Sequence, residues 1–181
     1  MLLIYGLTGL PCAGKGTAAA LIARETNAPV FVMSDELRAM LRERGIQPTR
    51  SALQSFVTGQ RRLRGNAFLA EIIAGKIDSA RDAVVDGLRS PEEAAVFRKA
   101  FPGNFLLVAV AAPLEKMFER SRVRGRENEP SEFAGFKKSV ERETAGEGFG
   151  IAACAALADA RLDNSGSREQ LEERVRALIR N

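Results

Sequence analysis

Residues 9–17, with the sequence Gly-Leu-Pro-Cys-Ala-Gly-Lys-Gly-Thr, are the part of the chain whose residue types and spacing point most directly to chemistry. Glycines in a strand-to-helix turn let successive backbone N–H groups surround phosphate oxygens, and the start of the helix adds partial positive charge. Lys15 can then reach the β- and γ-phosphates of a nucleotide. We therefore predict a phosphate-binding loop (P-loop) for ATP, in preference to a glycine-rich turn with a solvated lysine. The predicted ATP-binding residues of this loop are Gly9, Leu10, Pro11, Cys12, Ala13, Gly14, Lys15, Gly16 and Thr17.

Asp86 is the carboxylate best placed to help bind a metal ion. It follows the apolar run 83–85, and a carboxylate at the end of a buried strand beside a P-loop organises Mg²⁺ and its waters in phosphoryl-transfer proteins. A hydroxyl residue usually follows the P-loop lysine, but here Gly16 intervenes and the hydroxyl belongs to Thr17. We predict Mg²⁺ as the cofactor, with Asp86 and Thr17 as candidate ligands. The alternative for Asp86 is an ordinary Asp-Gly turn.

Arginines make up most of the basic residues and gather at 61–64 and 120–126, in a chain of net charge +4. Guanidinium groups bind phosphate oxygens in a bidentate manner, so such clusters favour nucleotide handling. They can also stabilise the charge that spreads over a phosphoryl group during its transfer. A solvated helix end is the alternative for the second cluster. The sequence contains no histidine, which excludes histidine general bases and histidine metal sites.

The composition, with 45% hydrophobic and 28% charged residues in 181 positions, fits one globular domain over residues 1–181. Short apolar runs without alternation are typical of strands that are covered on both faces. Because these runs alternate with helical patterns, we predict an α/β fold with five parallel strands and helices on both faces. The predicted strands are 2–7, 30–33, 83–85, 105–111 and 160–162, and the predicted helices are 16–25, 35–44, 51–73, 91–100, 113–122, 132–145 and 167–179.

The apolar N-terminal run 1–10 has no basic flank and is interrupted by glycines, so it fits neither a signal peptide nor a membrane span. The two cysteines are too few for a disulfide scaffold and form no metal motif. We therefore predict a cytoplasmic protein without a membrane partner. Aromatic residues make up 6% of the chain and tryptophan is absent, which argues against nucleic acid as a partner that stacks its bases on the protein.

The stretch 14–17, Gly-Lys-Gly-Thr, resembles the P-loop of adenylate kinases, in which magnesium is held largely through water. The stretch 86–89, Asp-Gly-Leu-Arg, is similar to the adenylate-kinase Asp-Gly-Phe-Pro-Arg but one residue shorter. The resemblance implies that Arg89 binds the phosphate of the acceptor. Arg61, on the predicted long helix, is a further candidate for the acceptor side.

Residues 33–38, Met-Ser-Asp-Glu-Leu-Arg, are similar to the adenylate-kinase segment that ends in Gly-Asp-Met-Leu-Arg. The resemblance implies a site role for Asp35 and a contact between Arg38 and the acceptor phosphate. Asp35 or Ser34 can also simply cap the helix that follows. If the acceptor oxygen belongs to a phosphate it needs no general base, whereas a sugar hydroxyl would need a carboxylate such as Asp35 to take its proton.

The stretch 122–126 resembles the Arg-x-x-Gly-Arg at the entrance to the lid of adenylate kinases, which implies catalytic roles for Arg122 and Arg126. Arg142, on the following helix, is a further candidate phosphate clamp. The segment 162–167 resembles the strand-loop-helix ending of the same kinases, where the loop contacts adenine, and Asn164 is its predicted ATP-binding residue.

As a whole, the chain resembles an archaeal family of adenylate-kinase-related and dephospho-coenzyme A kinase-like P-loop proteins. The resemblance implies a P-loop NTPase fold with a helical acceptor-binding insertion near 34–75 and a short lid near 124–136. It also implies ATP as the donor and a small phosphate-bearing acceptor, with AMP favoured. Two alternatives remain: phosphorylation of a sugar hydroxyl, as in dephospho-coenzyme A kinases, and a P-loop ATPase with a regulatory or RNA-associated role.

Overall fold

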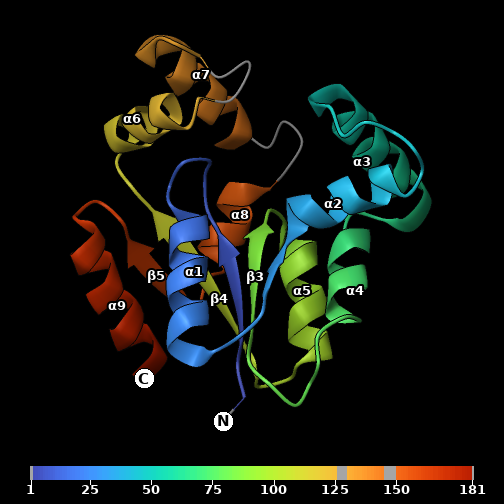
Figure 1. The fold of residues 1–181 in the computed structure, drawn as a ribbon, viewed down its shortest axis with the longest axis horizontal. Coiled ribbons are helices and arrows are strands. Elements are labelled where there is room, and N and C mark those ends of the chain that lie inside the picture. The colour runs from blue at the N-terminus through green and yellow to red at the C-terminus, as the bar shows by residue number, and fades with distance from the viewer. Residues whose placement is uncertain (1, 126–129, 145–149, 181) are drawn as a thin grey trace.

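The computed structural model describes residues 2–125, 130–144 and 150–180. Within them, five parallel strands form one sheet in the order β2-β3-β1-β4-β5. This arrangement, drawn in Figure 1, confirms the predicted α/β fold with a parallel sheet. The strands are β1 (Ile4–Thr8), β2 (Val30–Val32), β3 (Ala83–Leu88), β4 (Phe105–Ala111) and β5 (Ala160–Asp163).

Helices cover both faces of the sheet because alternate residues of the central strands point to opposite sides. Ala83 and Val85 pack into one core with α4 (Phe68–Ala74), α5 (Pro91–Ala100) and α8 (Ile151–Ala156). Val84 points the other way and packs with α1 (Lys15–Thr26) and α9 (Arg168–Arg180). Ala83, Val84 and Val85 are all fully buried, which explains why this part of β3 is a continuous apolar run.

β3 is longer than predicted. It continues past Asp86 to Leu88, so the prediction that Asp86 ends this strand is wrong. The residue after Asp86 is Gly87, whose φ of +105° favours glycine, and the pairing of β1 with β3 shifts register between Leu7 and Thr8. The bulge turns the strand just after the carboxylate, at the end of the sheet where the P-loop lies.

The helical insertion follows β2 and consists of α2 (Met33–Arg42), α3 (Arg50–Arg64) and α4. The single helix predicted over 51–73 is wrong, because the chain breaks at Gly65, which has a φ of +91°. α4 packs into the core of the sheet, whereas no residue of α3 between 51 and 64 is buried. The insertion therefore has a fixed part and a surface part.

Two helices lie over the P-loop end of the sheet, α6 (Leu114–Arg124) and α7 (Phe133–Thr144). Met117 on α6 and Phe136 and Val140 on α7 form a small apolar cluster with Ala13 of the P-loop. Figure 1 shows α6 and α7 on one side of this end of the sheet and α2 and α3 on the other. The predicted lid, 124–136, lies partly outside the described residues, and Arg126 falls in that part.

Candidate active site

The P-loop connects β1 to α1, and its glycines are required by close contacts. A Cβ atom on Gly9 would lie 2.3 Å from the carbonyl oxygen of Val110, and one on Gly14 would lie 1.9 Å from Nδ2 of Asn164. Gly14 is also the N-cap of α1, which has no side-chain cap and no acid in its first turn. The N-terminus of α1 therefore keeps its backbone N–H groups for an anion.

Lys15 lies folded over the P-loop. Its Nζ donates hydrogen bonds to the carbonyl oxygens of Gly9, at 2.8 Å, and Leu10, at 3.0 Å. Burial lowers the pKa of Lys15, while the nearby Asp86 carboxylate acts in the opposite direction. The structure thus brings together Lys15 and Asp86, the lysine and the carboxylate that the sequence analysis singled out.

Asp86 faces the start of α1. Its Oδ1 is buried and has no hydrogen-bond partner among the described residues, and burial raises the pKa of the carboxyl group. A Cβ atom on Gly16 would lie 3.7 Å from Asp86 Oδ2, so the missing side chain leaves room beside the carboxylate. A buried carboxylate oxygen without a partner, next to a phosphate loop, fits a Mg²⁺ ion held by one carboxylate, waters and phosphates.

Thr17 is exposed on the first turn of α1, and its predicted contact with Mg²⁺ stays a prediction. Within the described residues, no group of three or more acidic or cysteine side chains could hold a metal ion by itself.

Asn164 and Arg120 hold the P-loop from behind. The Asn164 side chain is buried and its Nδ2 donates to the carbonyl oxygen of Ala13 at 2.8 Å. Arg120, on α6, directs Nη1 at the carbonyl oxygens of Cys12 and Ala13, at 3.5 and 3.4 Å, and Nη2 at that of Asn164, at 3.0 Å. Sequence analysis predicted that Asn164 binds ATP and included Arg120 in the arginine cluster 120–126, but it did not predict a contact between Arg120 and the P-loop. We call the P-loop, Asp86, Arg120 and Asn164 the donor side.

Glu93 joins two predicted acceptor residues. It is 3% exposed, and its Oε2 accepts a hydrogen bond of 2.7 Å from the backbone N–H of Arg89, while Oε1 lies 4.0 Å from Nη2 of Arg61. Burial raises the pKa of Glu93, and the two arginines oppose that shift. The local sequence Ser90-Pro91-Glu92-Glu93, with Ser90 as the cap of α5, was the available signal for this residue.

Asp35 and Arg38 lie on the first turns of α2 and form an ion pair of 2.7 Å. The N-cap of α2 is Val32, without a side-chain cap, so the prediction that Ser34 or Asp35 caps this helix is wrong. The Asp35 side chain is 67% exposed, and its charge contributes to the raised pKa of Asp86. We call α2, α3, Arg89 and Glu93 the acceptor side.

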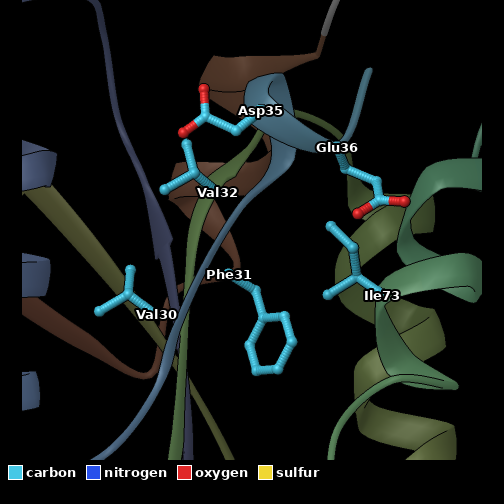
Figure 2. A pocket seen from close by; sticks show the side chains of 6 residues that line it. All are labelled: Val30, Phe31, Val32, Asp35, Glu36 and Ile73. Atoms are coloured by element: carbon cyan, nitrogen blue, oxygen red, sulfur yellow. The ribbon is translucent and has the colours of Figure 1, made fainter. Parts of the chain in front are cut away.

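A cavity of about 280 Å³ lies beside the edge strand β2. Figure 2 shows its apolar residues along and beside the strand, with Asp35 above Val32 and Glu36 above Ile73. Lys76 forms an ion pair of 2.6 Å with Glu36, whereas the Asp35 carboxylate remains largely in solvent. The Asp35 carboxylate therefore lines the cavity and is also accessible to solvent. Its lining residues are Val30, Phe31, Val32, Asp35, Glu36 and Ile73.

The remaining predicted arginines lie on the two helices above the P-loop. Arg122 lines a shallow pocket on α6 with Phe118 and Val123, and Arg142 is exposed on α7. The next residue, Glu143, has a buried Oε2 without a hydrogen-bond partner in the described part of the chain, and its charge raises the pKa of Lys15. An acid of α7, which sequence analysis did not consider, thus acts on the P-loop lysine.

The sheet order, the P-loop and the helices beyond its strand ends define a P-loop kinase-like fold. The structure is similar to a shikimate kinase from Bacteroides thetaiotaomicron, with 14% identity, a TM-score of 0.65 and coverage of 99% of this chain and 98% of that one. It is also similar to a gluconokinase from Sinorhizobium meliloti 1021, with 15% identity, a TM-score of 0.60 and coverage of 98% and 92%. At these identities the likeness shows the fold alone.

A family model described as an AAA domain matches residues 8–133. A UPF0200 protein from Hyperthermus butylicus is 38% identical over 179 residues, which are 98% of this chain and 93% of the relative. A UPF0200 protein from Methanoregula boonei is 35% identical over 178 residues, with 97% and 95% covered. The chain therefore belongs to the UPF0200 family. None of the helices in the described ranges has the length and apolarity that a membrane crossing requires.

Proposed function

We propose that this protein transfers the γ-phosphoryl group of ATP to a small phosphate-bearing acceptor, with a nucleoside monophosphate as the acceptor class and AMP as its first member. The observation that carries the proposal is that Lys15, at the start of α1, lies near Asp86 of β3, whose Oδ1 has no hydrogen-bond partner among the described residues. A positive side chain and an ionisable carboxylate around an anion-binding helix start are the parts that phosphoryl transfer needs.

On the donor side, Lys15 would exchange its hydrogen bonds with the carbonyl oxygens of Gly9 and Leu10 for bonds with the β- and γ-phosphates. Asp86 would hold Mg²⁺ or its water ligands through Oδ1. Mg²⁺ held there would supply positive charge to offset the negative charge that develops on the phosphate oxygens. The backbone N–H groups from Gly14 onward would bind the same phosphates.

On the acceptor side, Arg89 and Arg61 would bind the phosphate of the acceptor. Both lie against Glu93, and the charge of Arg89 acts on the pKa of Lys15 and of Asp86. Because the charge of Arg89 acts on both Lys15 and Asp86, this arginine is well placed to bind the acceptor group that receives the phosphoryl group. A phosphate oxygen is already anionic, so transfer to it requires no general base.

A second candidate function, phosphorylation of a sugar hydroxyl, is favoured by Asp35. This carboxylate is not a helix cap, is 67% exposed and influences the pKa of Asp86. It could therefore accept a proton from a hydroxyl acceptor once its ion pair with Arg38 rearranges.

The experiment that tests both functions incubates the protein with Mg²⁺-ATP and each of AMP, CMP, UMP, GMP and dephospho-coenzyme A, and measures products by chromatography. ADP formed in a one-to-one ratio with a phosphorylated nucleotide supports the first function. Release of inorganic phosphate alone, independent of every acceptor, would sink both and favour an ATPase.

Asp35→Asn separates the two kinds of acceptor. We expect it to leave AMP phosphorylation within about 2-fold of the wild type and to reduce phosphorylation of a hydroxyl acceptor by roughly 10²-fold or more. Full activity toward a hydroxyl acceptor in this variant would exclude Asp35 as the base.

A further inference from the structure

Arg120 joins three segments that lie far apart in the sequence. It belongs to α6, its Nη1 reaches the carbonyl oxygens of Cys12 and Ala13, and its Nη2 donates to the carbonyl oxygen of Asn164 at 3.0 Å. The Asn164 side chain completes the contact by donating to Ala13 at 2.8 Å, against the bare Cα of Gly14. The helix that leads to the lid is therefore bonded to the back of the P-loop.

These bonds fall on the carbonyl side of the P-loop peptides. The peptide between Ala13 and Gly14 receives two donors on its oxygen, one of them charged, and its N–H belongs to the turn that would surround the phosphates. Hydrogen bonds on the oxygen of a peptide polarise its N–H group and strengthen it as a donor. A guanidinium behind the loop also adds positive potential at the phosphate position.

We propose that Arg120 is a positioning residue for the donor nucleotide, which fixes and polarises the P-loop peptides at Cys12 and Ala13 and ties them to the loop at Asn164. The inference rests on the proposed binding of ATP at the P-loop. Because Arg120 reaches Ala13 and Asn164 with two separate nitrogens of its planar fork, the single nitrogen of a lysine cannot fully replace it here.

Isothermal titration of the purified protein with Mg²⁺-ATP tests the proposal. We expect Arg120→Gln to raise the Kd for Mg²⁺-ATP by about 10- to 100-fold and Arg120→Lys by about 3- to 10-fold, since bonds from charged donors are lost. In turnover with AMP, the KM for ATP rises in the same proportion and the KM for AMP stays within about 2-fold. Lys116→Gln, one turn earlier on α6, is the matched loss of charge and should leave Kd unchanged.

Inorganic tripolyphosphate as a competing ligand shows which half of the nucleotide Arg120 serves. If the residue acts through the P-loop, Arg120→Gln weakens the binding of tripolyphosphate by about the same factor as the binding of ATP. If Arg120→Gln weakened the binding of ATP but left the binding of tripolyphosphate unchanged, the effect would lie on the adenosine half of the nucleotide, and this result would overturn the proposal.

A merely structural Arg120 would give a lower Tm in Arg120→Gln with a Kd within about 2-fold of the wild type, and this result overturns the proposal. If Arg120→Gln does not fold, Arg120→Lys decides, because full ATP affinity in that variant removes the need for the fork. A wild-type protein that does not bind Mg²⁺-ATP overturns the donor half of the proposed function instead, and this outcome is distinct from equal binding by wild type and variant.

Discussion

The P-loop on the donor side is bonded from behind by Arg120 and Asn164, whereas α3 on the acceptor side has no buried residue between 51 and 64. The donor side is thus preformed, with its glycines fitted against fixed neighbours. On the acceptor side, the bond from Arg89 to Glu93 is short, while the ion pair that reaches α3 through Arg61 is long, at 4.0 Å. A site with one fixed and one loosely held side can bind ATP first and shape itself around the acceptor.

The largest expected effect comes from breaking the donor side at Lys15. Lys15→Ala removes the positive charge that lies over the carbonyl oxygens of Gly9 and Leu10, and we expect kcat/KM to fall by about 10³-fold or more. Steady-state kinetics measures this fall, with the acceptor that the assay of AMP, CMP, UMP, GMP and dephospho-coenzyme A identifies. Lys99→Ala, an exposed lysine on α5, is the matched control and should keep full activity, and a Lys15→Ala variant with equal turnover would contradict the assignment.

We expect Asp86→Asn to have opposite effects on activity and stability: activity falls and the folded protein becomes more stable. Activity should fall by roughly 10²-fold or more, because the carboxylate near the phosphates is lost. Burial raises the pKa of Asp86, so the folded protein holds a proton there more tightly than the unfolded chain does. The ionised carboxylate therefore destabilises the fold at neutral pH.

Removing the charge of Asp86 should raise the Tm at pH 7.5, by roughly 2–4 °C for each kcal/mol gained. The gain should shrink as the pH falls through the raised pKa of the folded state, and it should vanish below the ordinary aspartate pKa of about 3.9, where the carboxyl is protonated in both states. Thermal unfolding from pH 4 to pH 8 checks this prediction. Asp78→Asn, at an exposed position, is the control, and a Tm lowered by Asp86→Asn at every pH would contradict it.

Glu93→Gln tests the hold on the acceptor side. Glutamine keeps the hydrogen bond from the Arg89 N–H but loses the charge opposite Arg61, so the KM for AMP should rise by about 10-fold while that for ATP stays unchanged. If Glu93 acts through Arg61, the double variant with Arg61→Gln should be no worse than Arg61→Gln alone. Glu71→Gln, at an exposed position on α4, is the control, and additive losses in the double variant would exclude this coupling.

The smallest effect is expected at the ion pairs between α1 and α9, outside the site. Glu172 contacts Arg24, Arg168 and Arg176 at the surface. Glu172→Gln should lower the Tm by no more than about 2 °C, with the difference vanishing in 1 M salt and kinetics unaffected. A change in ATP affinity would show that the contact between α1 and α9 matters for the donor side.

The sheet could be predicted from the sequence because strands buried on both faces leave continuous apolar runs, and 105–111 matches β4 residue for residue. The helices after β2 were harder, since the break at Gly65 interrupts a pattern that stays helical on both sides. α8 was missed because its six residues, Ile-Ala-Ala-Cys-Ala-Ala, contain no polar face.

The P-loop motif pointed to Lys15, and the carboxylate after the apolar run 83–85 pointed to Asp86, although β3 continues past that residue to Leu88. Arg120 and Glu93 could not be found in the same way, because their roles depend on neighbours supplied by the fold. Arg120 lies 107 positions from Ala13, and Asn164 lies 151 positions from it. Local patterns identify the residues that belong to a motif, but not the ones that support it from elsewhere in the chain.

The break at Gly65 also divides the insertion into regions that should exchange their amide hydrogens at different rates. α4 is anchored by Phe68, Leu69 and Ile73 in the core, so its amides should open only with the sheet. α3 has no buried residue between 51 and 64 and packs against this core through the partly buried Phe56, so it should exchange through a separate local opening. Exchange that slows in α3 when AMP is added, with α4 unchanged, would make this helix a direct reporter of acceptor binding.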